Sequence, residues 1–332
     1  MLQIIKQRKY TYVFSLILIA LSLFALIQWG LKLGIDFKGG TLMEVQFIGE
    51  AENIKKNDQS KINTNKKEKT EEKQTIKNKY QPPNRQQISE KLKDLNLNSL
   101  IVQPSEKGKV ILRYMGSDEK LNEKVLERLN KLGKVKQLRV DFIGSSVSEQ
   151  LKKSAAWALW WSIIGIAVYI AWAFRKVSYP VPSWQYGIGA VIALAHDIII
   201  TVGVFAFLGH YYGIEVGIPF VAALLTILGY SVNDTIVVYD RTRENLLRSN
   251  NKETFEELVN RSLNETLARS INTSLTVIIV LLAIIFFGGA SIKYFSLALL
   301  IGVVAGTYSS IFVATALLVT SYYWTQKKHS DN

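Results

Sequence analysis

The stretch GIPFVAALLTILGYSVNDTIVVYDRTREN, from Gly217 to Asn245, is apolar over its first half, contains the carboxylate of Asp234 and then ends in charged residues. Its apolar part has the length of about 20 residues that a helix needs to cross a bilayer. A carboxylate at membrane depth costs about 2.5 to 3.5 kcal/mol on insertion scales, so it normally faces a bundle interior or a water-filled cavity. The stretch therefore predicts a membrane α-helical protein in which Asp234 lies between helices.

Five further apolar runs have a similar length. The 332 residues are 48% hydrophobic and have a mean hydropathy of +0.14, as expected of several lipid-embedded helices with one aqueous domain. The six expected transmembrane helices are Tyr10 to Trp29, Ala155 to Phe174, Tyr186 to Leu208, Val216 to Val238, Leu267 to Phe287 and Tyr294 to Tyr322. The expected domains are an N-terminal tail, a first span, a long loop, a five-helix region containing a loop, and a C-terminal tail: 1–9, 10–30, 31–154, 155–323 with 241–266, and 324–332.

Basic residues give the orientation of these spans. They cluster on one side, at 175–176, 241–261 and 327–328. Because cytoplasmic loops carry an excess of lysine and arginine, both termini are expected in the cytoplasm and the long loop outside it. The first span follows basic residues as a signal peptide would. Its apolar stretch is too long and it has no small-residue cleavage site, so it is expected to remain as an anchor.

The long loop, 31–154, predicts an α+β domain. Residues 51–84 are mostly lysine, asparagine, glutamine and glutamate, so they are expected to form a disordered insert. The rest alternates in the order β-α-β-β-α-β through TLMEVQF, RQQISEKLKDL, SLIVQ, KVILRY, SDEKLNEKVLERLNKLG and KVKQLRVDF. Ser117 or Asp118 is expected to cap the second helix and Gly133 to end it. This order predicts a ferredoxin-like split βαβ fold.

The composition argues against several functions. The chain has no cysteine, which excludes disulfides, thiolate metal sites and a cysteine nucleophile. Its formal charge is +13, but lysine and arginine cluster at the edges of the apolar runs, so the charge does not predict nucleic-acid binding. The expected outer domain has no nucleophile, no histidine cluster and no glycine-rich phosphate loop. A binding or mechanical role is favoured over an enzyme, and no cofactor is expected.

Arg269 is the expected partner of Asp234. Asp234 lies toward the cytoplasmic end of the fourth span and Arg269 just inside the start of the fifth, so antiparallel neighbours would bring them to similar depth. Four hydrogen-bonding residues accompany them: Ser231, Asn233, Asn272 and Thr273. Desolvation and a nearby cation change the proton affinity of a carboxyl in opposite directions, so a small movement could load and release a proton. The residues alone leave open a proton relay and a static ion pair.

Asp197, near the middle of the third span, is a second relay candidate, with helix packing as the alternative. Its neighbour His196 is expected to point elsewhere, because adjacent residues do not share a helix face. The two are therefore not expected to form a dyad. A lone intramembrane histidine without a second ligand in register does not predict a metal site.

Glycines mark two further places. Gly302 and Gly306 form a GxxxG pattern in the sixth span, which is expected to let a neighbouring helix approach closely. Gly39 and Gly40 are expected to turn the chain between the first span and the sheet. The nearby side chain of Asp36 could be a solvent-exposed residue flanking the turn, or it could make a contact at a hinge. The stretch 250–270 is amphipathic, as expected of a helix that lies on the cytoplasmic face of the membrane.

Five segments of this chain resemble the SecF family, in the same order and over nearly the whole chain: LGIDFKGGTLMEV, HDIIITVGVFA, GYSVNDTIVVYDRTREN, LARSINTSLT and GVVAGTYSSIF. The resemblance implies a subunit of the RND-type transporter superfamily in the bacterial inner membrane, with its large loop in the periplasm. It implies SecD as the partner in a SecDF complex, SecYEG and YajC as further partners, and an unfolded exported polypeptide as the client. The insert at 51–84 departs from the usual SecF pattern, in which the first strand of the outer domain leads quickly to its first helix.

The resemblance also bears on the two open interpretations. Residues that match Asp234 and Arg269 are implicated in proton conduction in the SecF family, which favours the relay. The implied function is use of the proton gradient to promote late-stage preprotein translocation. The alternative is a passive scaffold that stabilises a translocon without conducting protons.

Overall fold

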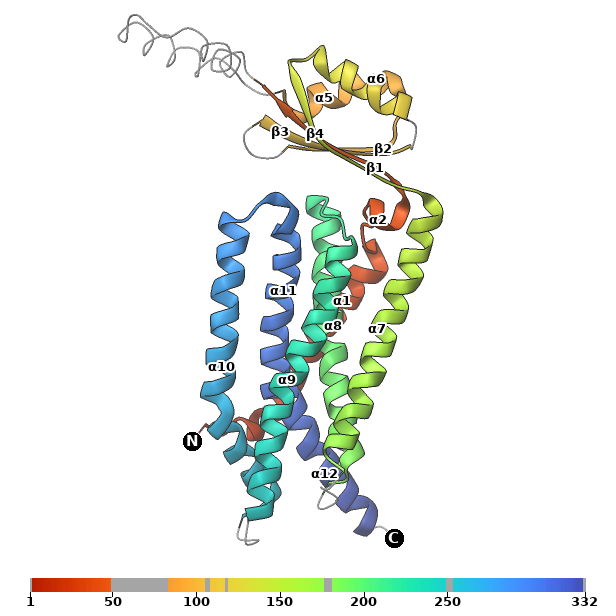
Figure 1. The fold of residues 1–332 in the computed structure, drawn as a ribbon. Helices are drawn as coiled ribbons and strands as arrows, with labels where there is room; N and C mark the ends of the chain where they lie inside the picture. The colour runs from red at the N-terminus through yellow and green to blue at the C-terminus, as the bar shows by residue number, and fades with distance from the viewer. Residues whose placement is uncertain are drawn as a thin grey trace, which may run out of the picture. The chain divides into compact units, whose positions relative to one another are not determined.

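The computed structural model describes residues 2–48, 83–104, 108–116, 119–175, 181–248 and 253–330 (Figure 1). The chain forms two units, a helical one from Met1–Leu33 and Lys152–Asn332 and an α+β one from Gly34–Leu151. Most of the expected disordered insert, residues 51–82, and the expected cap residues Ser117 and Asp118 lie outside the described residues.

The α+β unit contains one four-stranded sheet. Its elements are β1 (Gly40–Phe47), α5 (Arg85–Leu92), β2 (Asn98–Pro104), β3 (Lys109–Met115), α6 (Glu119–Asn130) and β4 (Val135–Ile143). The strands lie in the order β2-β3-β1-β4, and every neighbouring pair is antiparallel. This is the expected β-α-β-β-α-β order, and it is consistent with the ferredoxin-like fold predicted from the sequence.

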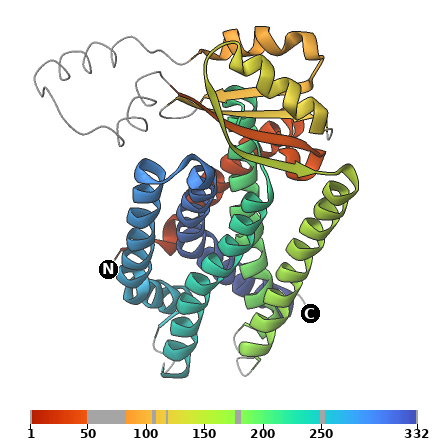
Figure 2. The same ribbon diagram turned by 45° about the horizontal axis from the view of Figure 1, so that its top comes forward.

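Alternation along β1 places one row of side chains in the core of this unit. Met43, Val45 and Phe47 are buried, and α5 and α6 pack over that face of the sheet (Figure 2). A capping box between Asn84 and Gln87 begins α5. Tyr114 of β3 donates to Asn122 Oδ1 of α6 at 2.5 Å, and burial raises the pKa of Tyr114 to about 12. The hydroxyl therefore stays protonated and ties helix to sheet.

Two glycines connect a short helix, α2 (Ile35–Lys38), to β1. Gly39 has a φ of +77° and Gly40 a φ of +129°. A Cβ on Gly40 would lie 2.6 Å from the carbonyl oxygen of Tyr114, and one on Gly39 would lie 3.3 Å from that of Ile143. Both positions therefore require glycine for conformation, and Gly40 requires it for space. Asp36 lies in the first turn of α2.

Six helices of the described chain are long and apolar enough to cross a membrane, so this is a multi-pass membrane protein. A 3-10 turn, η1 (Ile5–Gln7), leads into the first. The elements are α1 (Arg8–Trp29), α7 (Ser145–Ala173), α8 (Ser183–Tyr212), α9 (Ile218–Arg248), α10 (Phe255–Phe287), and the sixth span composed of α11 (Ala290–Ser309), the π turn η5 (Ser310–Ala314) and α12 (Thr315–Ser330). In the most apolar 18-residue stretch of each span, the buried share is 50% in α8, 50% in α9 and 56% in the sixth span, but only 6% in α7. The helices α8, α9 and the sixth span therefore form the centre of the unit.

Most of the segment 241–266, which is expected to connect the fourth and fifth spans, is helical in the described residues. α9 continues to Arg248 and α10 begins at Phe255. Glu244 forms ion pairs with Arg241 at 2.6 Å and Arg248 at 2.7 Å along α9, at helical spacing. A capping box between Thr254 and Glu257 begins α10. Hydropathy marks only the apolar part of a helix, so it does not locate where these amphipathic ends stop.

Both ends of the chain lie beside the start of α10. The backbone N–H of Leu2 donates to Asn264 Oδ1 at 2.9 Å. Glu256 forms an ion pair with Arg8 at 2.9 Å and accepts from the Tyr323 hydroxyl at 3.0 Å. The two termini and the connection between α9 and α10 therefore share one end of the helical unit.

Candidate functional site

Asp197 of α8 is a fully buried carboxylate held by three hydrogen bonds. Its Oδ1 lies 2.9 Å from His196 Nδ1, and its Oδ2 accepts from Ser231 Oγ of α9 at 2.6 Å and from Ser309 Oγ of α11 at 2.8 Å. A buried charge is tolerated when hydrogen bonds satisfy it. Asp197 therefore joins the three central helices of the unit.

The expectation that His196 points away from Asp197 is wrong. Both side chains are buried, at 2% and 0% exposure, and they are in hydrogen-bond contact. Successive Cβ atoms on a helix do diverge by about 100°, but an imidazole with its near nitrogen at Nδ1 can turn back to a short neighbouring carboxylate. The far nitrogen, Nε2, is buried with no hydrogen-bond partner in the described part of the chain, and the ring stacks on Tyr308 at 5.9 Å.

Asp234 of α9 receives a hydrogen bond from Ser310, the first residue of the π turn. Both residues are buried. Ser310 was not predicted from the sequence as a partner of Asp234. Ser231, expected beside Asp234, instead donates to Asp197.

The expected ion pair between Asp234 and Arg269 is not present. Within the described ranges no ion pair within 4.0 Å joins the two side chains, and the Arg269 side chain is exposed on α10. On this helix Ser270 and Ser274 are buried and Arg269 is not, because consecutive residues point about 100° apart. Three of the expected supporting residues are also exposed: Asn233, Asn272 and Thr273.

Close approach of α11 to α9 brings the serines within reach of the carboxylates. A Cβ on Gly306 would lie 2.9 Å from the Cβ of Ser231, and one on Gly302 would lie 2.2 Å from Ile227 Cδ1. Neither glycine could be enlarged without moving a neighbour. The predicted GxxxG pattern therefore lies directly at the contact that positions Ser231 against Asp197.

A second polar cluster continues from the same place. Ser274 of α10 lies 2.6 Å from Thr307 Oγ1 of α11 and accepts from the Tyr230 hydroxyl of α9 at 3.2 Å. The Ser310 hydroxyl also lies 3.2 Å from the carbonyl oxygen of Thr307. The buried Ser270 hydroxyl, one turn before Ser274, has no hydrogen-bond partner in the described ranges. Hydroxyl groups therefore extend from Asp234 toward α10.

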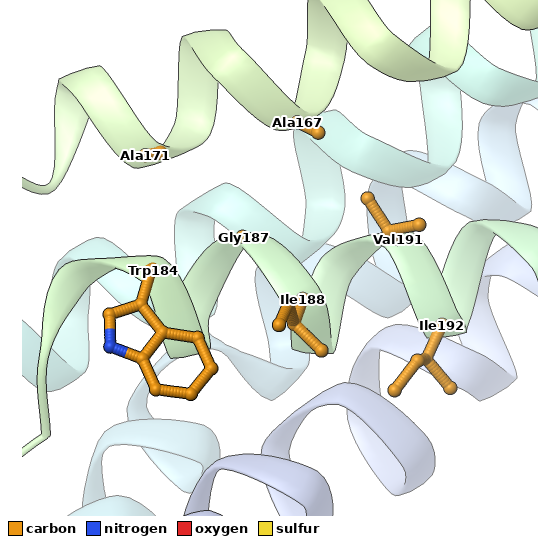
Figure 3. Close-up of a pocket in the computed structure, with 7 residues that line it drawn as sticks. All are labelled: Ala167, Ala171, Trp184, Gly187, Ile188, Val191 and Ile192. Atoms are coloured by element: carbon orange, nitrogen blue, oxygen red, sulfur yellow. The ribbon is translucent and has the colours of Figure 1, made fainter.

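Other parts of the helical unit offer less chemistry. In the described ranges no group of three or more histidine, cysteine, aspartate or glutamate side chains could hold a metal ion. A groove between α7 and α8 is lined by Ala167, Ala171, Trp184, Gly187, Ile188, Val191 and Ile192 (Figure 3). Those residues are apolar or aromatic, so this groove carries no acid, base or ion ligand.

Comparison with known proteins connects this arrangement to protein export. Residues 122–324 match the model of the family described as protein export membrane protein SecD/SecF, C-terminal, and residues 24–47 match the SecD/SecF GG motif. Gly39 and Gly40 lie in the second match. The chain is 40% identical to protein translocase subunit SecF of Thermobaculum terrenum over 96% of this chain and 94% of that protein. It is 36% identical to the SecF subunit of Haemophilus influenzae over 95% and 84%.

Solved structures give the same relationship. A crystal structure of SecDF from Thermus thermophilus, described as a translocon-associated membrane protein, is 28% identical and superposes with a TM-score of 0.74. The match covers 97% of this chain and 38% of that one. This chain therefore spans less than half of that protein, and the activity and partners of the whole do not transfer directly.

Proposed function

The chain belongs to the SecF family of protein translocase subunits, and we propose that, together with SecD, it uses the proton gradient across the bacterial inner membrane to promote late-stage preprotein translocation. The observation that carries this proposal is Asp234, a buried carboxylate in an apolar span whose partner is a hydroxyl and not a cation. Intramembrane carboxylates of this kind are typical of proton pathways.

The partner of the Asp234 carboxylate suits a group that changes charge. A serine hydroxyl can donate to a carboxylate or accept from a carboxylic acid, so Ser310 can satisfy both forms of Asp234. An ion pair would favour the charged form alone. A static Asp234–Arg269 lock would require contact between the two side chains, and no ion pair joins them in the described residues. The relay therefore has more support than the passive scaffold.

Arg269 and Asp197 have separate roles in this proposal. Arg269 stands on the exposed face of α10, and we place it opposite Asp234 only after the helices move. A cation brought near the site would then favour proton release. Asp197 is a second proton site, since His196 and two serines surround it.

The name of the solved relative supports the proposed partner. That protein is named SecDF, and this chain matches 38% of it, so we propose SecD as the partner in a SecDF complex. SecYEG, YajC, the unfolded exported polypeptide and membrane lipid complete the proposed surroundings. Both termini lie in the cytoplasm and the α+β unit in the periplasm.

Replacing Asp234 with Asn tests the function, because Asn keeps the shape and cannot titrate. In membrane vesicles with SecD, the variant is expected to be as abundant as the unmodified chain and to lose the gradient-dependent part of export, while ATP-driven early steps continue. Asp240→Asn is the matched control. It lies on the same helix, where Asp240 forms an exposed ion pair with Arg243 at 3.3 Å. Full gradient-dependent export by the Asp234 variant would falsify the relay.

A further inference from the structure

Ser309 and Ser310 are consecutive residues that contact carboxylates on two different helices. Ser309 donates to Asp197 of α8, and Ser310 donates to Asp234 of α9. Side chains of adjacent residues point about 100° apart on a helix. Ser309 can therefore face α8 while Ser310 faces α9, because this part of the sixth span contacts both helices. The pair stands at the junction of α11 with the π turn.

Each of the two hydroxyls has one proton and two acceptors within reach. Ser309 Oγ lies 2.8 Å from Asp197 Oδ2 and 3.2 Å from the Gly306 carbonyl oxygen. Ser310 Oγ contacts Asp234 Oδ2 and lies 3.2 Å from the Thr307 carbonyl oxygen. A hydroxyl can donate one strong hydrogen bond, so in each case the carboxylate and the helix carbonyl compete for the same proton.

The charge of the carboxylate decides that competition. A charged carboxylate holds the serine proton, because hydrogen bonds to ions are about twice as strong as neutral ones. A protonated carboxyl can itself donate to the serine oxygen, and the serine proton is then free for the carbonyl three residues earlier. The Gly306 carbonyl also accepts from the backbone N–H of Ser310. The hydroxyl therefore changes the hydrogen bonding of the backbone at the point where α-helix becomes π turn.

We propose that Ser309 and Ser310 are positioning residues that convert the charge of Asp197 and Asp234 into the register of the π turn. This inference rests on the proposed function above, since it assumes that the two carboxyls exchange protons. Single π turns inside α-helices are frequent at functional sites. Closing the π turn into an α-helix shifts the following residues by one position, which rotates α12 by about 100° relative to α11.

The far side of the turn has contacts through which such a rotation would be felt. On α12, Ser321 Oγ donates to Gln185 Oε1 of α8 at 2.5 Å, and Thr325 Oγ1 accepts from Gln185 Nε2 at 3.0 Å. Tyr323 donates to Glu256 of α10. Register in the turn therefore controls which residues of α12 meet α8 and α10, beside both ends of the chain.

Other titratable groups face the two carboxylates. His196 contacts Asp197 directly, and Tyr308 of α11 stacks on that imidazole. Because acidification would change His196 as well, the test uses Asp→Asn substitutions as the neutral form in place of a pH change.

Spin labels on the cysteine-free chain can report the register. Cysteines replace Val304 before the turn and Trp324 after it, which are 51% and 66% exposed. The full chain is reconstituted with its SecD partner in lipid vesicles, and the distance between the two spin labels is measured by pulsed electron paramagnetic resonance. A second pair, Ile188→Cys with Phe207→Cys, brackets the uninterrupted helix α8 and serves as the control that must not shift.

The proposal predicts a dependence on the serine hydroxyls. Asp234→Asn is expected to shift the Val304–Trp324 label distance when Ser310 is present, to leave it unchanged in Ser310→Ala, and to shift it again in Ser310→Thr, which restores a hydroxyl. Asp197→Asn is expected to behave in the same way with Ser309. Ser296→Ala, a buried serine on α11, is the control for loss of a hydroxyl, and the shift must survive it.

Two results would overturn the inference: no shift with either Asn variant, or an equal shift when the serine is replaced by alanine. Neither result decides the proposed function, which is read from export. Loss of gradient-dependent export in Asp234→Asn without a label shift would refute the register switch and leave the relay intact. A serine-dependent shift with full export would refute the relay, and the π turn would then respond to the charge of the carboxyls without any role in gradient-dependent export.

Discussion

Ser310 donates its hydroxyl proton to the carboxylate of Asp234, in the place where the sequence alone predicts the guanidinium of Arg269. The exchange of a cation for a hydroxyl changes what the site can do. A paired arginine would hold the carboxyl charged, whereas a hydroxyl satisfies both protonation states. In the structure the Asp234 carboxylate is paired with a hydroxyl, and the Arg269 side chain is exposed on α10.

Replacing Arg269 with Gln is expected to separate function from stability. The side chain is exposed and makes no ion pair with Asp234, so the free energy of unfolding should change by no more than about 0.5 kcal/mol. Gradient-dependent export should fall strongly if Arg269 meets Asp234 later in the cycle. Protein level and export are measured in the same vesicles, with Arg243→Gln as the control for loss of an arginine. Equal export by the two variants would remove Arg269 from the mechanism.

Replacing His196 with Ala is expected to destabilise the helical unit by about 1 to 3 kcal/mol, because Asp197 loses a partner in a fully buried site. His196→Asn keeps a donor near the position of Nδ1 and should recover much of the loss. The measurement is thermal unfolding of the purified chain in detergent, followed by export in vesicles. If Ala and Asn variants unfold at the same temperature as the unmodified chain, the His196–Asp197 hydrogen bond contributes nothing to stability.

Replacing Gly306 with Ala is expected to push α11 away from α9. The added Cβ would meet the Ser231 Cβ at 2.9 Å, and overpacking of this kind costs about 1 to 3 kcal/mol. Gly229→Ala on α9 is the matched control, since a Cβ there meets nothing within 4 Å and alanine favours a helix by about 1 kcal/mol. The measurement is the abundance of each variant in the membrane, which is expected to be lower for Gly306→Ala than for Gly229→Ala. Equal abundance of the two would mean that this contact can relax without cost.

Replacing Gly40 with Ala is expected to weaken the α+β unit by about 1 to 3 kcal/mol, because its φ of +129° is unfavourable for a side chain. The new Cβ would also meet the Tyr114 carbonyl at 2.6 Å. Gly144→Ala, where the nearest atom is a phenylalanine ring carbon at 4.0 Å, is the control. The stability of the α+β unit in the two variants is compared by limited proteolysis of the full chain. The same digestion rate for both variants would contradict the steric argument.

Apolar run length and alternation are strong signals, so six spans and the β-α-β-β-α-β order could be predicted from the sequence. Contacts between helices could not, because hydropathy gives no rotation of one helix about its axis. A rotation of α10 by one residue position decides whether Arg269 or Ser270 faces the core. The hydrogen bonds of Ser309 and Ser310 to the two carboxylates could not be predicted either. A π turn does not change the hydrophobic periodicity of a span that is apolar on all sides, so the sequence does not show where it lies.

The orientation of the spans remains a prediction, and the structure sharpens its test. Residues 2 and 323 both contact the start of α10, so the termini and the α9–α10 connection must lie on one side of the membrane. Lys120→Cys in α6 and Arg248→Cys at the end of α9 are both exposed and described. A membrane-impermeant maleimide should label the first in right-side-out vesicles and the second only in inverted ones, and detergent should expose both. The reverse pattern would invert the proposed topology and place the α+β unit in the cytoplasm. A relay driven by inward proton flow would then have to load Asp234 from the opposite end of α9.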